Sequence, residues 1–234
     1  MKRMSGSIAS STMVVFVCVV SLAGCVSRAL AERPIEGEPV RLVVRIAPDA
    51  RVRADYSVTI DAKDPVRSLI SIGTTAAKAD QAFRAQERMD AAMQGIDLAR
   101  IIEEELASFY SDGLDMPIVA SSREATYTVT MHVREYGIDA GRAGSSIRFV
   151  LKGRVEMHDP ADGRIWRYSF NEEQPVSPAI FGLPSAAGNV FSAAMLAELT
   201  EPEIAAGLER VARNAAWSVG DRFVRDLSRQ RRRR

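Results

Sequence analysis

The sequence predicts an α+β domain, a two-layer sandwich of an antiparallel sheet covered by helices on one face, behind a cleaved lipoprotein signal peptide. Residues 126–134 alternate strictly between apolar and polar side chains, which is the pattern of a half-buried strand. Residues 74–94 and 204–227 instead repeat their apolar side chains at helical spacing. Strands and helices that are each apolar on one side must bury those sides against one another, which gives two layers.

The chain opens with a segment typical of an exported lipoprotein. A basic start precedes an apolar run at 13–20, which is too short to cross about 30 Å of hydrocarbon as a helix. Directly behind it stands the tetrapeptide Leu22-Ala23-Gly24-Cys25. Small side chains before the cysteine fit a peptidase groove, and the Cys25 thiol is a nucleophile that could be modified at this point of the chain.

The two cysteines of the chain are Cys18, inside the apolar run, and Cys25. A mature domain without further thiols has no intrachain disulfide and must be stabilised by a hydrophobic core. We therefore divide the chain into a signal peptide at 1–24, a lipidated cysteine with a flexible tether at 25–39, a single periplasmic α+β domain at 40–228 and an arginine-rich tail at 229–234.

The domain is expected to begin with two strands. Apolar and polar side chains alternate over 40–46, and Pro48-Asp49 offers a turn before a second apolar stretch at 52–60. This arrangement predicts a β-hairpin.

Two helices, or one kinked helix, are expected next. Residues 74–94 are rich in alanine and carry a weak apolar stripe, which Gly95 interrupts. Asp97 is placed to cap a new helix with Leu98, Ile102, Leu106 and Phe109 on its buried side, and Gly113 suits its end.

A three-stranded antiparallel meander follows. Its strands are predicted at 126–134, 147–157 and 165–170, with a strong turn signal at 159–163 before the last. The closing helix is announced by a capping box of Thr200 and Glu203. Its buried stripe comprises Ile204, Leu208, Val211, Ala215, Val219, Phe223 and Leu227.

The sequence shows no signal for catalysis, a metal ion or a cofactor. His132 and His158 lack the closely spaced ligands that a metal site needs, and no nucleophile elbow, phosphate loop or dinucleotide fingerprint occurs. Glu103, Glu104 and Glu105 point in different directions on a helix and are read as a solvated face. Basic and acidic residues balance at 31 and 30, which disfavours a nucleic-acid partner.

Residues 177–199 form a connection that is unusually apolar for a loop. It either folds back on the sheet or presents a surface to a protein or lipid partner, because exposed apolar patches mark interaction sites. The candidate contact residues are Ile180, Phe181, Leu183, Phe191 and Trp217. The terminal arginines are either a solvated tail or a contact for anionic phosphates.

The tetrapeptide ending in Cys25 resembles the lipobox of bacterial lipoproteins. Together with the order of elements, it is similar to small Gram-negative outer-membrane lipoproteins of the YajG-like or lipopolysaccharide-assembly lipoprotein type. That resemblance implies a lipid-modified, palmitate-bearing Cys25 that holds the protein on a membrane. Since Val26 rather than aspartate follows Cys25, it also implies the outer membrane, with the domain facing the periplasm.

The function expected from these observations is non-enzymatic: the periplasmic domain binds or helps to assemble an envelope component. Two alternatives stay open. One is an auxiliary lipoprotein of an ABC-type lipid transport system. The other is a periplasmic hydrolase, in which His132 or His158 would line a pocket beside a serine or an acid.

Overall fold

The structure is a computed structural model that describes residues 30, 32–48, 51–53, 65–139, 147–161, 163–176, 195 and 197–232, with the side chains of 51–53 and 65–79 left out. Cys25 and its lipobox lie outside the described residues, as do Ile180, Phe181, Leu183 and Phe191 of the apolar connection. The predictions made for them stay predictions.

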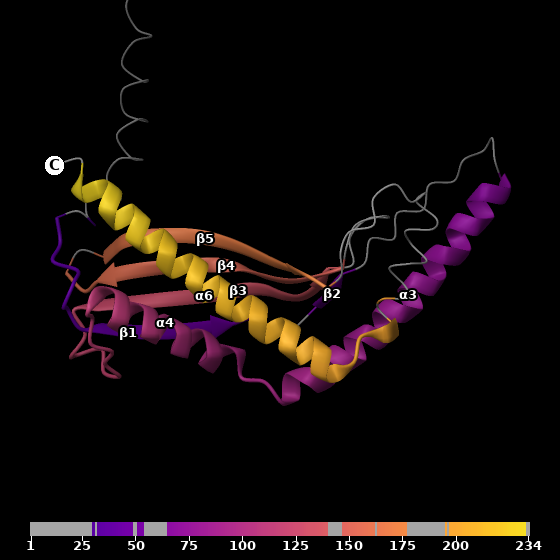
Figure 1. Cartoon of the computed structure of the whole chain (residues 1–234), viewed down its shortest axis with the longest axis horizontal. Coiled ribbons are helices and arrows are strands. Elements are labelled where there is room, and N and C mark those ends of the chain that lie inside the picture. Colours follow the sequence, from indigo (N-terminus) through magenta and orange to yellow (C-terminus); the bar gives the residue numbers. More distant parts are fainter. Residues whose placement is uncertain are drawn as a thin grey trace, which may run out of the picture.

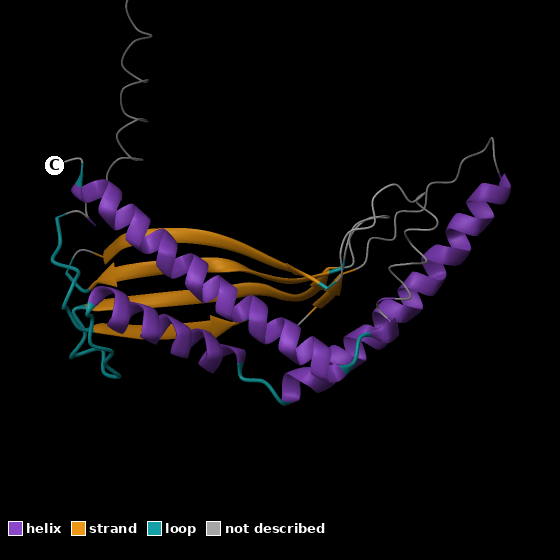
Figure 2. Ribbon diagram, in the orientation of Figure 1, coloured by secondary structure: helices purple, strands orange, loops and turns teal. Residues whose placement is uncertain are grey.

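The fold is an α+β sandwich of two layers, which confirms the predicted class. Its elements are β1 (Val40–Ile46), β2 (Arg51–Arg53), α3 (Pro65–Gln94), α4 (Leu98–Leu114), β3 (Tyr127–Asp139), β4 (Arg148–Asp159), β5 (Gly163–Pro175) and α6 (Glu201–Arg231). The sheet runs in the order β1-β3-β4-β5, and β2 also pairs with β3. Helices α4 and α6 lie side by side over one face, whereas α3 continues away from the sheet beside β2 (Figure 1, Figure 2).

The predicted hairpin at the start of the domain is wrong. Both β1 and β2 pair in parallel with β3, with Val40 opposite Tyr127 and Arg51 opposite Gly137, so the sheet is mixed rather than wholly antiparallel. Strand β2 therefore runs in the same direction as β1, along the same edge of β3. Alternation along a strand shows which side chains are buried but not which strand lies beside it.

Helices α3 and α4 are two separate helices rather than one kinked helix. Asp97 caps α4 as predicted, since its carboxylate accepts a hydrogen bond of 2.9 Å from the backbone N–H of Arg100. Gly113, however, lies inside α4. The helix ends at Leu114 because Asp115 adopts the left-handed conformation, with φ of 54°. Helix α3 begins at Pro65, earlier than the predicted start at 74.

The meander and the closing helix agree with the sequence. Strands β3, β4 and β5 pair in antiparallel order, and the turn between the last two follows Asp159. The capping box of α6 is complete, with the Glu203 carboxylate accepting hydrogen bonds from the backbone N–H and the hydroxyl of Thr200. Every residue of the predicted α6 stripe is buried.

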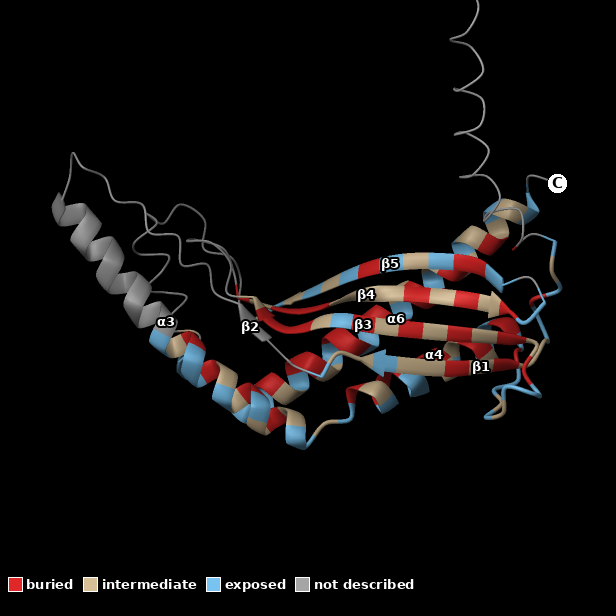
Figure 3. Ribbon diagram, turned by 180° about the vertical axis from the view of Figure 1, so that it is seen from behind, coloured by how far each residue is buried: buried red, intermediate tan, exposed pale blue. Residues whose placement is uncertain are grey.

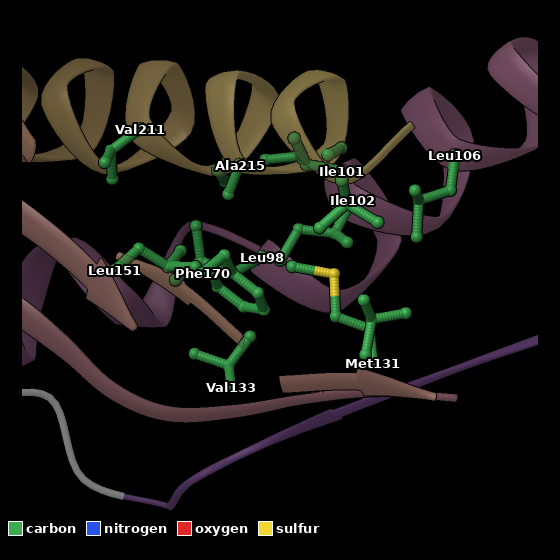
Figure 4. Packing of buried hydrophobic residues seen from close by; sticks show 14 of the residues in the cluster. Leu98, Ile101, Ile102, Leu106, Met131, Val133, Leu151, Phe170, Val211 and Ala215 are labelled. Atoms are coloured by element: carbon green, nitrogen blue, oxygen red, sulfur yellow. The ribbon is translucent and has the colours of Figure 1, made fainter. Parts of the chain in front are cut away.

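The core fills the space between the sheet and the two helices. Figure 4 shows Leu98, Ile102 and Leu106 of α4 and Val211 and Ala215 of α6 above sheet residues that include Met131, Leu151 and Phe170.

The packed domain extends past both predicted boundaries. Leu30 and Ile35, which we had placed in the tether, are fully buried, and α6 continues to Arg231, which pairs with Glu36 at 2.8 Å. Within the described ranges, no helix is long and apolar enough to cross a membrane.

Candidate functional site

A hollow lies on the outer surface where α4 and α6 run together. Its volume is about 330 Å³, and its lining consists of Glu105, Ser108, Phe109, Asp112, Gly113 and Trp217. Trp217 is 62 % exposed, although most side chains of this size are largely buried in folded proteins. The hollow therefore combines an exposed indole, a phenyl ring and a carboxylate.

Helical spacing places both rings at this site. Phe109 precedes the fully buried Tyr110 on α4 and is only half-buried, packed against the edge of the core. Trp217 follows the buried Ala216 on α6 and faces outward. The helices approach closely beneath the hollow, because a Cβ added to Gly220 of α6 would lie 2.6 Å from the Phe109 ring. Gly220 thus lets the Phe109 ring lie directly on the backbone of α6.

The polar rim of the hollow is acidic. Glu105 forms an ion pair with Arg213 of α6, which joins the two helices across the rim. Asp112 accepts hydrogen bonds from the hydroxyls of Ser108 and Ser111, at 2.9 Å and 3.0 Å. Within the described part of the chain, no cationic side chain pairs with Asp112. A positive group on a bound molecule would meet a carboxylate that has two hydroxyl donors but no ion-pair partner among the described residues.

Glu105 departs from the solvated face that we had expected for the three glutamates. Its side chain is only 21 % exposed and is held by Arg213, whereas Glu103 and Glu104 are exposed. Glu105 is less exposed than the other two glutamates because α6 packs against this side of α4.

Behind the hollow, a row of aromatic rings leads into the core. Ring centroids lie 5.8 Å apart between Phe109 and Tyr110, 5.7 Å between Tyr110 and Phe223, and 5.0 Å between Phe223 and Trp166, all in edge-to-face geometry. Burial raises the pKa of the Tyr110 hydroxyl far above its usual range, and this hydroxyl has no hydrogen-bond partner among the described residues. The Phe109 wall of the hollow is thus packed directly against aromatic side chains of the core.

The two histidines lie elsewhere, on the face of the sheet away from the helices. His132 on β3 is flanked by Arg45 and Arg154, and burial together with these charges lowers its pKa. His158 Nε2 lies 3.7 Å from Glu156 Oε2 on β4. Among the described residues, no group of three His, Cys, Asp or Glu side chains is arranged to hold a metal ion.

Of the two aromatic residues that line the hollow, the sequence singled out Trp217 as a contact residue but not Phe109. Trp217 was a predicted contact residue, and the structure leaves it exposed beside the hollow. Phe109 was assigned to the buried stripe of α4, yet its ring forms a wall of the hollow. Its position one residue before the bulky Tyr110 is the signal that could have identified it, since adjacent helical residues point about 100° apart.

The fold and the hollow define an α+β protein with two helices on one sheet face and an exposed aromatic site between those helices. No family model matches the chain, and no curated protein matches it.

Solved structures give weak likenesses. A protein of family DUF330 from Xanthomonas campestris is 12 % identical with a TM-score of 0.36, over 82 % of this chain and 90 % of that one. The PelC dodecamer from Paraburkholderia phytofirmans is 16 % identical with a TM-score of 0.31, over 70 % and 90 %. A candidate lipoprotein from Caulobacter crescentus is 18 % identical with a TM-score of 0.30, over 56 % and 84 %. Sequence identities and TM-scores this low do not support a conclusion about the function of this chain.

Proposed function

We propose that the protein is a lipid-anchored protein of the bacterial outer membrane, with a non-enzymatic periplasmic domain that binds another envelope protein in the hollow between α4 and α6. The anchor is Cys25, as its resemblance to a lipobox cysteine implies. The contact residue of the hollow is Trp217, one of the five residues singled out from the sequence.

The exposure of Trp217 is the observation that carries this proposal. Leaving an indole in water sacrifices the stabilisation of about 1.5–3 kcal/mol that burial of a large apolar side chain typically brings. Tryptophan is also the residue type most enriched among the few side chains that dominate binding energies at protein interfaces. Trp217 and Phe109 both line a hollow of about 330 Å³, so a partner side chain has a place to enter.

The hollow specifies the chemistry of its partner. Its volume lies at the low end of the range of about 300–1,000 Å³ for ligand pockets, which suits one or two apolar side chains rather than a large cofactor. The Asp112 carboxylate, which has no cationic partner among the described residues, favours a lysine or arginine beside them. We therefore expect a protein segment that presents an apolar side chain next to a basic one.

A non-enzymatic role is supported by where the histidines lie. His132 and His158 belong to a charged layer on the opposite face of the sheet, and neither lines the hollow. Replacing both with asparagine is expected to leave partner binding unchanged. A loss of function in that variant would favour the hydrolase alternative.

The experiment compares partners captured after crosslinking in cells. Trp217→Ser removes the indole, and Gly113→Leu fills the hollow, since nothing lies within 4 Å of a Cβ added at Gly113. Phe83→Ser is the matched control, because Phe83 is 67 % exposed on α3 and does not line the hollow. Circular dichroism confirms that each variant is folded.

We expect the same protein to be lost with Trp217→Ser and with Gly113→Leu and to be retained with Phe83→Ser. If both hollow variants keep every partner, the hollow is not the binding site. If Phe83→Ser loses the same protein, capture depends on general surface apolarity, and the proposal is equally wrong.

A further inference from the structure

Among the described residues, no helix covers the face of the sheet that points away from α4 and α6. Figure 3, which views the molecule from behind, shows this face. Strand register places its side chains in rows across four strands. Arg41, Thr128, His158 and Arg164 form one row, Val43, Thr130, Glu156 and Arg167 the next, and Arg45, His132, Arg154 and Ser169 the third.

This face carries an excess of positive charge over these three rows. Its five arginines, which we call the arginine face, are Arg41, Arg45, Arg154, Arg164 and Arg167, and the three rows contain a single carboxylate, Glu156. That carboxylate lies 3.5 Å from Arg154, 3.3 Å from Arg164 and 3.9 Å from Arg167. One negative charge is thus shared among three guanidinium groups.

Two arginines of the face have no carboxylate of their own. Within the described residues, neither Arg41 nor Arg45 forms an ion pair, and Arg45 is exposed. The excess is local, because basic and acidic residues balance over the whole chain and α4 carries four carboxylates against one arginine. Positive charge therefore gathers on the sheet side and negative charge on the α4 side.

The effect of these charges is visible at His132, in the middle of the third row. Burial lowers its pKa first, and the nearby charges of Arg45, Arg154 and Arg134 lower it further, while Glu156 opposes them. Burial would penalise any charge at this position, so only the part of the shift that comes from the arginines reports the positive charge around His132.

We infer that the arginine face docks on an anionic lipid surface. The five arginines lie on one face of the sheet, and each basic side chain close to an anionic bilayer surface adds to the binding of a protein. The remaining polar side chains of the three rows include the hydroxyls of Thr128, Thr130 and Ser169, which can donate hydrogen bonds to phosphate oxygens. The rows contain no aromatic ring on which a base or sugar could stack.

This orientation leaves the helices free. Because α4 and α6 cover the other side of the sheet, a domain lying on lipid by its arginine face presents Trp217 and the acidic rim away from the membrane. The inference does not depend on the hollow being a binding site, and each can fail separately.

The test measures binding of the full chain to vesicles. A Cys25→Ser background prevents acylation, and vesicles of phosphatidylcholine alone are compared with equal parts phosphatidylcholine and phosphatidylglycerol. The readout is the ratio of the two partition coefficients, to which the apolar amino-terminal segment contributes equally in every variant. Arg45→Gln with Arg154→Gln alters the face. Arg84→Gln with Arg225→Gln changes the net charge equally on helices, where both arginines sit in exposed ion pairs.

We expect the preference for anionic vesicles to fall about fivefold for each arginine removed from the face and to stay unchanged in the helix control. Added salt should weaken the preference, since exposed charges are screened over about 10 Å at 0.1 M. If Arg45→Gln with Arg154→Gln does not fold, Arg41→Gln with Arg167→Gln replaces it.

Equal losses in the face variant and the helix control would overturn the inference, because net charge alone would then explain the binding. An unchanged preference in the face variant would overturn it too. The last experiment measures the binding of polyphosphate in solution. If polyphosphate binds the arginine face as well as the vesicles do at equal phosphate concentration, the occupant is a soluble polyanion and not a lipid surface.

Discussion

Gly220→Ala and Gly113→Ala are the same substitution on facing helices, and we expect them to change stability in opposite directions. A Cβ at Gly220 would lie 2.6 Å from Cδ2 and Cγ of Phe109 and 2.7 Å from Cδ1. Carbon atoms in good contact are about 3.5–4.0 Å apart, so the ring must move by about 1 Å. At Gly113 nothing lies within 4 Å, and the new methyl group meets open space.

The magnitudes follow from two opposing effects. Alanine stabilises a helix interior by about 1 kcal/mol relative to glycine, and this gain applies at both sites. Overpacking at Gly220 costs about 1–3 kcal/mol, because the atoms that must move belong to the base of a packed ring. We therefore expect Gly220→Ala to lower the free energy of unfolding by about 1 kcal/mol and Gly113→Ala to raise it by up to about 1 kcal/mol.

Urea denaturation of both variants measures this difference, and in thermal denaturation 1 kcal/mol corresponds to about 2–4 °C for a domain of this size. Phe109→Ala supplies the control, because in its background the clash is gone and Gly220→Ala should become stabilising. If Gly220→Ala stabilises the native chain as much as Gly113→Ala does, the close approach of α4 and α6 beneath the hollow is not real.

Three further results are expected from single substitutions. Thr200→Ala removes the capping box of α6 and should cost about 1 kcal/mol in urea denaturation, and a change near zero would show that Glu203 caps the helix without it. Tyr110→Phe removes a buried hydroxyl that has no partner among the described residues, so it should leave the free energy of unfolding unchanged or raise it, whereas a loss above about 1 kcal/mol would reveal a hidden hydrogen bond. His132 has its pKa lowered in the folded chain by burial and by Arg45 and Arg154, so the unfolded chain binds more protons as the pH falls below the ordinary value of 6.5. Its contribution to stability is complete above that pH and is lost below it; His132→Asn should therefore flatten the fall in unfolding free energy between about pH 7 and pH 5, and an unchanged slope would contradict this.

Local signals in the sequence predicted the elements whose structure is set locally. Asp97 and Thr200 begin helices because their side chains accept or donate within one turn, and the α6 stripe is buried along its whole length. The end of α4 was harder to predict. Gly113 was the expected stop, but a glycine inside a helix has no distinct signal, and Asp115 takes the left-handed conformation instead.

Features set by distant parts of the chain could not be predicted in the same way. The alternation at 40–46 showed that β1 is half-buried, yet its parallel pairing with β3 depends on residues more than 80 positions away. The hollow similarly depends on how α4 and α6 pack against each other. Trp217 could be singled out because it lies outside the buried stripe of α6. Phe109 could not, because it lies within the predicted stripe of α4. The arginine face is assembled from three separate strands, and its five arginines are scattered along the sequence.

Photocrosslinking from position 217 shows whether a partner protein occupies the hollow between α4 and α6. A benzophenone side chain replaces Trp217 in the full chain in living cells, and the same side chain at Phe83 is the control at an equally exposed position on α3. Our account expects a discrete crosslinked protein from position 217, absent from position 83, whose attachment site lies in a segment with an apolar residue beside a lysine or arginine. No protein adduct from position 217, or the same adduct from both positions, would contradict the claim that the hollow between α4 and α6 binds a partner.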